Sequence, residues 1–484
     1  MSDDGAVLGI DVGTTQVKVG AVTFAGRVLG IGRSGYPVER PRPGWAEQDP
    51  DAWWAAIVAA TRAALAAAPP GTAAAIRAIA VVGQGPTTVC TDAAGVPLRP
   101  AITWLDTRAA ELAGTLGRAI GISSWQLGPL PHERWIATHA AELHARTAHF
   151  LGAWDWVTLR LSGEAIRAVT PGSGQPTDAT LRAGGADPAR FGRPVGWSEV
   201  VGTLLAGPAA ELGLPPGIHV VAGGNDAFAS FHGAAMTAPG DAVDTGGTSG
   251  GFGVYADRPL ELPGTYLAPA ALPGTWILGG AMNATGRALA WLGEVSGGPD
   301  GAVPMDRLIA EAAAVPPGAD GLVFLPYLAG ERSPVWDARA RGVFAGLTLT
   351  HGRGHLARAV LEGAAFALRH VAEPIVGAGV HVRSMVVSGT TGATRAWSVM
   401  KADITGFPVA IPEVPETALL GAAILGALGA GAWPDPVGAI VGMVRIAERI
   451  DPDPALADLY AARYAAYRAL YPATAPIVHG LGPD

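Results

Sequence analysis

Two short turns, each opened by an acidic residue, are the first candidates in this sequence for phosphate chemistry. Residues 11–15 are Asp-Val-Gly-Thr-Thr, and residues 244–250 are Asp-Thr-Gly-Gly-Thr-Ser-Gly. Glycine and threonine leave backbone N–H groups and hydroxyls free, so such a turn can surround an oxyanion without steric obstruction. A single turn of this kind is more typical of a plain hairpin. Its recurrence at corresponding positions of two halves favours phosphate binding.

A third acidic residue, Asp226, ends the sequence Gly-Gly-Asn-Asp at residues 223–226, directly after the apolar residues 220–222. A carboxylate within hydrogen-bond reach of a hydroxyl can take its proton during phosphoryl transfer. Asn and Asp are also favoured N-caps of helices. From the residues alone, a catalytic base and a helix cap are equal alternatives for Asp226.

Other nucleotide-binding motifs are missing from the sequence. It contains no Gly-x-x-x-x-Gly-Lys-Ser/Thr motif, and its lysines are Lys18 and Lys401. Amides, hydroxyls and a metal would therefore have to meet the phosphate charge. The first turn leads into another strand and not into a Gly-x-Gly-x-x-Gly helix start, which argues against a Rossmann-type oxidoreductase.

Composition limits the class of protein. A chain of 484 residues predicts two or more domains, and 49% hydrophobic with 15% charged residues predicts a globular protein. The net charge of −8 with dispersed arginines argues against nucleic-acid or anionic-membrane binding. Cys90 is the single cysteine, which excludes an internal disulfide. Glycines interrupt the apolar residues 418–433, which predicts a buried helix, and the absence of a leader predicts a cytoplasmic protein.

Strands and helices are expected to alternate, as in an α/β protein. Asp49-Pro50-Asp51 predicts a helix N-terminus, and Pro69 stops that helix after residue 68. A second helix is expected from Thr107. Strands are expected at residues 7–10, 17–23, 28–31, 76–82, 101–104, 219–222, 242–245 and 252–255. The turn signals near residues 232–240 predict a boundary between domains 1–236 and 237–484.

Several longer stretches resemble one family. Residues 342–347 are Gly-Val-Phe-Ala-Gly-Leu, followed by His355-Leu356 and by Ala-Val-Leu-Glu at residues 359–362. This is similar to the second signature of the FGGY carbohydrate kinases, and residues 44–50 and 324–328 resemble further family stretches. The resemblance implies an α/β, two-domain actin/hexokinase-like (ribonuclease H-like) ATPase fold with an interdomain cleft, a sugar-binding first domain and an ATP-binding second domain.

The resemblance also implies roles for the motifs above. Asp226 would be the general base and, with Asn225, would contact the sugar, while Asp11 and Asp226 would hold Mg²⁺. Residues 388–397 lie where the family has an adenosine-binding loop, although Thr390 and Thr391 replace its usual glycines. The implied ATP contacts are Thr14, Thr15, Gly247, Thr248, Gly389, Thr390 and Gly392.

The acceptor is harder to infer. Gln84-Gly85-Pro86 stands where glycerol kinases have Arg-Glu and xylulokinases have Met-His, so glycerol is disfavoured. Gln84 and Asp106 are the further substrate candidates, Asp106 as a sugar ligand or a structural residue. We expect a pentulose such as xylulose. The alternatives are an erythritol-like polyol, another ketose, or a non-catalytic actin-like protein that binds ATP and a sugar. A homodimer is expected only at the level of the family.

Overall fold

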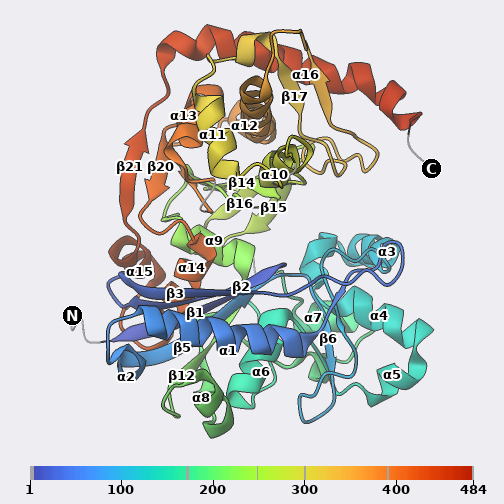
Figure 1. Ribbon diagram of the computed structural model, residues 1–484. Helices are drawn as coiled ribbons and strands as arrows, with labels where there is room; N and C mark the ends of the chain where they lie inside the picture. The colour runs from blue at the N-terminus through green and yellow to red at the C-terminus, as the bar shows by residue number, and fades with distance from the viewer. Residues whose placement is uncertain (1–4, 171–173, 248, 299–300, 390–391, 482–484) are drawn as a thin grey trace. The chain divides into compact units, whose positions relative to one another are not determined.

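The computed structural model describes residues 5–170, 174–247, 249–298, 301–389 and 392–481. These residues form two compact units. The first contains residues 1–233 and 417–444, and the second contains residues 234–416 and 445–484. Figure 1 shows that each unit has its own sheet and its own covering helices.

The first unit is built on a mixed six-stranded sheet in the order β11-β12-β5-β1-β2-β3. The three central strands β12, β5 and β1 are parallel, and the pairs β1–β2, β2–β3 and β11–β12 are antiparallel. The opening meander is confirmed. The strands are β1 (Ala6–Val12), β2 (Gln16–Thr23), β3 (Val28–Gly35), β5 (Ile76–Gly83), β11 (Val200–Thr203) and β12 (His219–Asn225).

Two-residue and three-residue strand pairs complete this unit. They are β4 (Glu47–Gln48) with β7 (Ala101–Ile102), β6 (Val89–Thr91) with β8 (His149–Leu151), and β9 (Ile166–Ala168) with β10 (Arg193–Val195). The helices are α1 (Pro50–Ala67), α2 (Thr72–Ala75), α3 (Ala110–Ile120), α4 (Leu130–His139), α5 (Ala141–Arg146), α6 (Ala153–Ser162), α7 (Asp178–Ala183), α8 (Ala206–Leu212), α9 (Asp226–Gly233), α14 (Thr417–Gly429) and α15 (Pro436–Met443). Two 3-10 turns are η1 (Ser124–Leu127) and η2 (Pro188–Phe191).

Helix α1 begins where the sequence predicts. The Asp49 carboxylate accepts the Asp51 N–H at 3.0 Å, and Pro50 occupies the first helical position. The helix predicted from Thr107 instead begins at Ala110. Its predicted first turn is held in another conformation, because Thr103 and Thr107 donate their N–H groups to the carbonyls of Ala46 and Gly44.

Helices α1 and α14 cover opposite faces of the first sheet. The Cα atoms of Gly30 and Gly32 on β3 face α1, whereas Gly20 on β2 faces Leu419 of α14. Gly20 pairs with Ile31, which lies between Gly30 and Gly32 on β3. Successive residues of a strand face opposite sides of the sheet, so α1 and α14 contact opposite faces. The apolar stretch predicted to be a buried helix thus forms one over residues 417–429, and residues 430–433 follow as a turn. No helix in the described part of the chain is long and apolar enough to cross a membrane.

The position of α14 differs from the predicted division at residues 236 and 237. Residues 417–444 lie within the predicted second domain in the sequence but belong to the first compact unit. Helix α14 packs on α9, β1, β5 and β12, all from the first part of the chain. Its small residues Gly421 and Ala422 allow this close packing, which local sequence patterns do not reveal.

The second unit repeats the strand arrangement of the first. Its sheet has the order β15-β16-β14-β13-β19-β20-β21, in which β13, β19 and β20 are parallel and the other neighbours are antiparallel. The β13–β14 turn therefore corresponds to the β1–β2 turn. The strands are β13 (Asp241–Asp244), β14 (Gly250–Ala256), β15 (Tyr266–Pro269), β16 (Trp276–Met282), β19 (Ser384–Val387), β20 (Val409–Pro412) and β21 (Ile446–Ile450).

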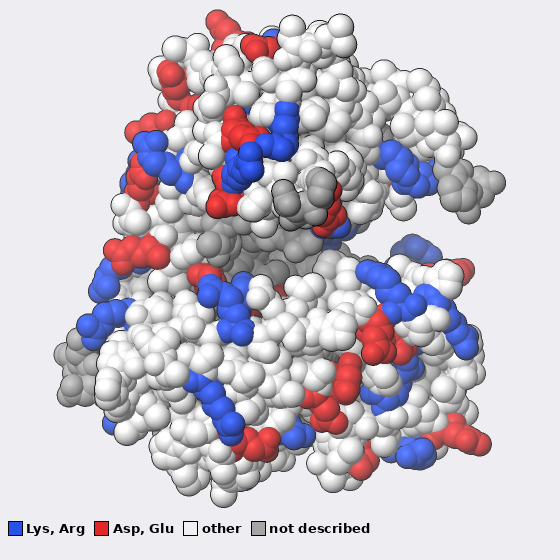
Figure 2. Space-filling view, in the orientation of Figure 1, with Lys and Arg blue, Asp and Glu red and all other residues white. Residues whose placement is uncertain are grey.

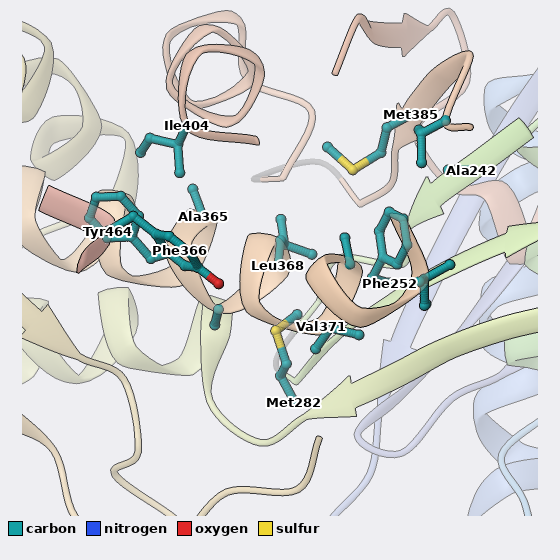
Figure 3. Packing of buried hydrophobic residues seen from close by; sticks show 14 of the residues in the cluster. Ala242, Phe252, Met282, Ala365, Phe366, Leu368, Val371, Met385, Ile404 and Tyr464 are labelled. Atoms are coloured by element: carbon teal, nitrogen blue, oxygen red, sulfur yellow. The ribbon is translucent and has the colours of Figure 1, made fainter. Parts of the chain in front are cut away.

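One long helix, α12 (Arg353–Gly377), crosses the core of the second unit. Its Phe366 and Leu368 lie in a buried cluster with Phe252 and Met282 from the sheet and Tyr464 from α16, as Figure 3 shows. The remaining elements are α10 (Thr285–Val295), α11 (Met305–Ala313), α13 (Arg395–Thr405), α16 (Ala457–His479), β17 (Val323–Leu325), β18 (Val343–Ala345), η3 (Ala319–Gly321) and η4 (Pro454–Leu456).

Charged side chains of both signs are interspersed on the face of the molecule drawn in Figure 2. Several form pairs on the surface, such as Arg287 with Glu294 and Arg395 with Glu448. Exposed pairs of this kind contribute little to folding. Stability therefore depends mainly on the two cores.

The contact between α14 and α9 gives a test of this packing. A Cβ atom on Gly421 would lie 2.0 Å from the Ala229 carbonyl oxygen, so the backbones must separate to admit it. We expect Gly421→Ala to lower the free energy of unfolding by about 1–3 kcal/mol, as overpacking does. Urea denaturation measures the change.

Gly207→Ala is the matched control, because a Cβ on Gly207 in α8 meets nothing within 4 Å. This variant should be as stable as the wild type or slightly more stable. Equal stability of the two variants would contradict the proposed close contact.

Candidate active site

The parallel strands of the first unit bring three predicted site residues to one edge of the sheet. Val12 of β1 and Asn225 of β12 both pair with Gly83, the last residue of the central strand β5. Asp11, Gln84 and Asp226 stand next to these three residues in the sequence. The carboxyl ends of neighbouring parallel strands thus form one polar row, as is usual for sites in α/β proteins.

A bulge in β12 precedes Asp226. The pairing with β5 shifts between Val221 and Gly224, so one extra residue is inserted in β12. Gly223 has φ +73°, and a Cβ atom there would lie 1.7 Å from the Val81 carbonyl oxygen. Glycine is required at this position, because the strand turns here before it delivers Asn225 and Asp226 to the sheet edge.

The structure separates the two roles that the sequence left open. The Asn225 Oδ1 atom accepts the N–H groups of Ala227 at 3.0 Å and Phe228 at 3.3 Å and so caps α9. Asp226 Oδ1 also accepts the Ala227 N–H, at 2.7 Å. Capping is thus provided chiefly by Asn225, whose amide N–H groups remain the part suited to a ligand.

Electrostatics at this edge favour a proton acceptor that works near neutral pH. Burial and, next, the negative charge of Asp11 raise the pKa of Asp226 to about 7, while Lys18 opposes the rise. Lys18 pairs with Asp11 across β1 and β2, and its Nζ atom lies 3.8 Å from Asp11 Oδ2. The sequence analysis gave Lys18 no role. Counting back from the turn between the two strands pairs Lys18 with Asp11, so this neighbour could have been predicted.

Tyr36 is a second residue of this site that the sequence analysis missed. Its hydroxyl donates to the Gly13 carbonyl, and its backbone N–H donates to the Thr15 carbonyl at 3.1 Å. Burial raises the pKa of the Tyr36 hydroxyl, and the charges of Asp11 and Asp226 raise it further. Tyr36 thus holds the first turn in place and lies close to both carboxylates.

A chain of hydrogen bonds connects the first turn with Gln84. The Trp104 Nε1–H donates to Thr14 Oγ1 at 2.9 Å. Gln48 donates to the Thr14 carbonyl at 2.7 Å and accepts from Gln84 Nε2 at 2.7 Å. Because Gln84 donates to Gln48, its Oε1 atom faces elsewhere. Gln84 Oε1 is buried and has no hydrogen-bond partner among the described residues. Thr15, the other predicted contact of the first turn, is exposed.

Asp106 is placed differently from a sugar ligand. Its Oδ2 accepts the Ala46 N–H at 2.7 Å and Arg108 Nη2 at 2.6 Å, and its Oδ1 accepts Arg108 Nε at 2.8 Å. The hydrogen bonds of Arg108 hold the pKa of Asp106 below its usual value although burial opposes this. These contacts give the Asp106 carboxylate a structural role, and its contact with a sugar stays a prediction.

The second unit brings the other two predicted loops together. Asp244 at the end of β13 pairs with Val387 at the end of β19, and the Ser388 N–H donates to the Asp244 carbonyl at 3.0 Å. Gly247 and Gly389 follow these strand ends. A Cβ atom on Gly389 would lie 3.4 Å from the Gly247 nitrogen. The predicted contacts Thr248 and Thr390, and the loop residue Thr391, lie outside the described residues.

Family comparisons agree with this arrangement in both units. Residues 6–233 match the N-terminal domain of the FGGY family of carbohydrate kinases, and residues 242–430 match its C-terminal domain. The chain belongs to the FGGY family. It is an ATP-dependent sugar kinase, and the resemblance predicted from the sequence is confirmed.

Relatives of this FGGY kinase act on different acceptors. The chain is 32% identical to the xylulose kinase of Escherichia coli (strain K12) over 419 residues, covering 82% of this chain and 84% of the relative. It is 29% identical to the gluconokinase of Bacillus subtilis (strain 168) over 455 residues, with 88% of each chain covered. The crystal structure of xylulose kinase from Rhodospirillum rubrum is 32% identical, with a TM-score of 0.79 over 98% of this chain and 100% of that one.

The kinase has two further carboxyls whose pKa is raised to about 7, Asp155 and Glu331. Both are enclosed, with exposed fractions of 1% and 3%. Asp155 accepts from Gln175 Nε2 at 3.0 Å, and Glu331 Oε1 accepts from the Asn283 N–H at 2.9 Å. Asp226 is more accessible than either, so it is the best placed of the three to meet a substrate.

The ends of β1 and β12 also suit Mg²⁺. In phosphoryl-transfer sites this ion takes one or two carboxylates together with substrate phosphates and keeps several waters. Asp11 and Asp226 supply two carboxylates. No group of three or more His, Cys, Asp or Glu side chains among the described residues could hold a metal without such phosphates.

The raised pKa of Asp226 predicts a change of stability with pH. An unfolded Asp ionises near pH 4 and the folded Asp226 near pH 7, so ionisation costs folding free energy as pH rises through this window. We expect Asp226→Asn to match the wild type at pH 4 and to be more stable by about 2 kcal/mol at pH 8, since one pKa unit is about 1.4 kcal/mol and solvent screens part of the shift. Urea denaturation at both pH values measures this difference, and a difference independent of pH would contradict it.

Proposed function

We propose that this kinase transfers the γ-phosphoryl group of Mg-ATP to a hydroxyl of a neutral sugar, a pentulose such as xylulose, with Asp226 as the general base. The observation that carries the proposal is the pair Asp11 and Asp226 at the ends of parallel strands, with a pKa for Asp226 of about 7. A base with a pKa near the operating pH is best suited to proton transfer.

The proposed reaction balances without another reactant. The sugar oxygen forms a bond to the γ-phosphorus, and the bond from that phosphorus to the bridging oxygen breaks, its electrons leaving with ADP. The hydroxyl proton moves to the Asp226 carboxylate. Asp226 holds the hydroxyl at the right distance and takes up its proton, while the turn after β1 holds phosphate oxygens with its N–H groups.

Asp11 and Asp226 would hold Mg²⁺, which neutralises negative charge on the phosphates when it is bound. Lys18 lies beside Asp11 and would balance part of the remaining charge. Thr14, with its hydroxyl next to Trp104, would contact the phosphates from the same turn. In the second unit, Gly247, Gly389 and Gly392 would contact the nucleotide.

Charge supports a neutral acceptor over gluconate. Among the described residues, the charged side chains that shift the pKa of Asp226 are Asp11 and Lys18. Lys18 is already paired with Asp11 and Mg²⁺ would be taken up by the ATP phosphates, so these side chains offer a substrate carboxylate no further positive charge. A ketose or a polyol brings only hydroxyls.

The fixed amide of Gln84 supports a hydroxyl acceptor as well. Its Nε2 donates to Gln48, so its Oε1 can only accept a hydrogen bond. A sugar hydroxyl that donates to this oxygen would satisfy a buried group that otherwise costs folding free energy. The Asn225 amide N–H groups would donate to a sugar oxygen in turn.

The central prediction concerns turnover of Asp226→Asn. Sugar-dependent ADP formation with Mg-ATP is measured across ketopentoses, ketohexoses, tetritols, pentitols, gluconate and glycerol. We expect a ketopentose to be the best acceptor and the variant to lose kcat by ~100-fold or more, as expected for removal of a general base. Because the same variant should be more stable at pH 8, its loss of activity cannot come from unfolding.

Asp187→Asn is the control, since Asp187 caps the 3-10 turn η2 elsewhere in the first unit. It should keep wild-type turnover. Undiminished turnover of Asp226→Asn would refute the base. If a polyol or gluconate were the best acceptor, the role of Asp226 as base would stand and the proposed substrate class would be wrong.

A second prediction concerns Gln84→Leu. Loss of a buried acceptor for a sugar hydroxyl should raise the KM for the sugar by about tenfold or more and leave the KM for ATP unchanged. Steady-state kinetics with each substrate varied in turn measures both constants. Thr61→Val removes another buried, unpartnered oxygen, on α1, and should change neither constant. A sugar KM within twofold of wild type for Gln84→Leu would exclude the contact.

A further inference from the structure

A buried lysine lies beneath the two loops of the second unit. Lys401 on α13 is 1% exposed, and its Nζ atom lies 2.6 Å from Asp244 Oδ2. The same atom donates to the Gly392 carbonyl at 2.9 Å and lies 4.2 Å from the centre of the Trp397 ring. One ammonium group therefore contacts Asp244, which is distant in the sequence, together with a carbonyl and a ring from residues 392–397, directly before it in the chain.

Each contact fixes a different element. Asp244 ends β13, and its other oxygen, Oδ1, accepts the Gly246 N–H of the following turn at 3.0 Å. Gly392 belongs to the loop between β19 and α13. Trp397 is itself held by a hydrogen bond from its Nε1 to the Leu361 carbonyl of α12, at 3.1 Å. Lys401 thus connects both loops to the helical core.

The geometry argues against direct phosphate binding by Lys401. An ammonium group has three N–H donors, and these contacts give it a carboxylate, a carbonyl and an aromatic face. The charge of Asp244 also offsets that of the ammonium. Lys401 therefore acts on a ligand through the loops and not by its own charge.

Stability alone does not explain this ion pair. Removing two charges from water costs several kcal/mol per ion, and apolar replacements of buried pairs are often equally or more stable. A pair that fixes the spacing of two loops accounts better for a lysine in this place, because a loop position that is wrong by 1 Å weakens a site strongly.

We infer that Lys401 is a positioning residue for the nucleotide, which sets the distance between the β13–β14 turn and the β19–α13 loop. The inference rests on the proposed function, which assigns Gly247, Gly389 and Gly392 to the nucleotide. It goes beyond that function in making nucleotide affinity depend on a side chain that touches no substrate.

The test is calorimetric titration of the full-length protein with ADP, together with the KM values for ATP and sugar. Lys401→Met should weaken ADP binding and raise the KM for ATP, each by about tenfold or more. The KM for the sugar should stay within twofold of wild type. Lys401→Arg, which keeps the charge, should restore part of the affinity.

Two further variants separate positioning from stability. Lys401→Met with Asp244→Asn removes both charges, so its Tm should recover while its affinity for ADP stays low. Arg358→Met breaks another buried ion pair of the same unit, that of Arg358 Nε with Glu362 Oε1 at 2.7 Å on α12. It should lower the Tm and leave the affinity for ADP unchanged.

The outcomes distinguish this inference from the proposed function. Wild-type affinity for ADP in Lys401→Met would overturn the role of Lys401 and leave the kinase mechanism intact. Equal loss of affinity in Arg358→Met would also overturn it, because general loosening would then explain the effect. Failure of the wild type to bind ADP would overturn the nucleotide assignment itself.

Discussion

The repulsion between Asp11 and Asp226 is the constraint on which the site depends. Both carboxylates stand at the ends of parallel strands on either side of β5, and the backbone fixes them there. Burial and, next, this repulsion raise the pKa of Asp226, so its ionisation near neutral pH costs folding free energy. Lys18, paired with Asp11, lowers that cost, and Tyr36 holds the first turn.

The two units use one strand arrangement for two kinds of chemistry. Each has a turn opened by an Asp at the end of a central strand, and each Asp has a lysine partner. In the first unit the partner is the partly exposed Lys18, at 3.8 Å from Asp11. In the second it is the enclosed Lys401, at 2.6 Å from Asp244. The second pair is thus the shorter and the more enclosed of the two.

Local signals predicted the parts of the fold that depend on neighbours in the sequence. Alternating apolar residues predicted the meander, the Asp49 cap predicted α1, and the glycine pair at residues 223–224 predicted the strand end before Asp226. The structure contains all three. Helix α14 was assigned to the second half because its packing on β1 and β12 depends on residues about 200 positions or more away. The Tyr36 and Lys401 contacts were missed for the same reason, since their partners meet only in the folded sheet.

The distinction between Asn225 and Asp226 shows where sequence reasoning reaches its limit at the site. Both residue types cap helices, and only the observed bonds from Ala227 and Phe228 to Asn225 Oδ1 show which one does so chiefly. Gln84 presents the same difficulty, because an amide can donate or accept. Gln48 donates its own N–H to the Thr14 carbonyl and accepts the N–H of Gln84. The Gln84 oxygen is therefore the atom left to accept a hydrogen bond. The family fixes the phosphoryl chemistry, whereas its members are named for different acceptors. Relatives that are about 30% identical can therefore share the first and differ in the second.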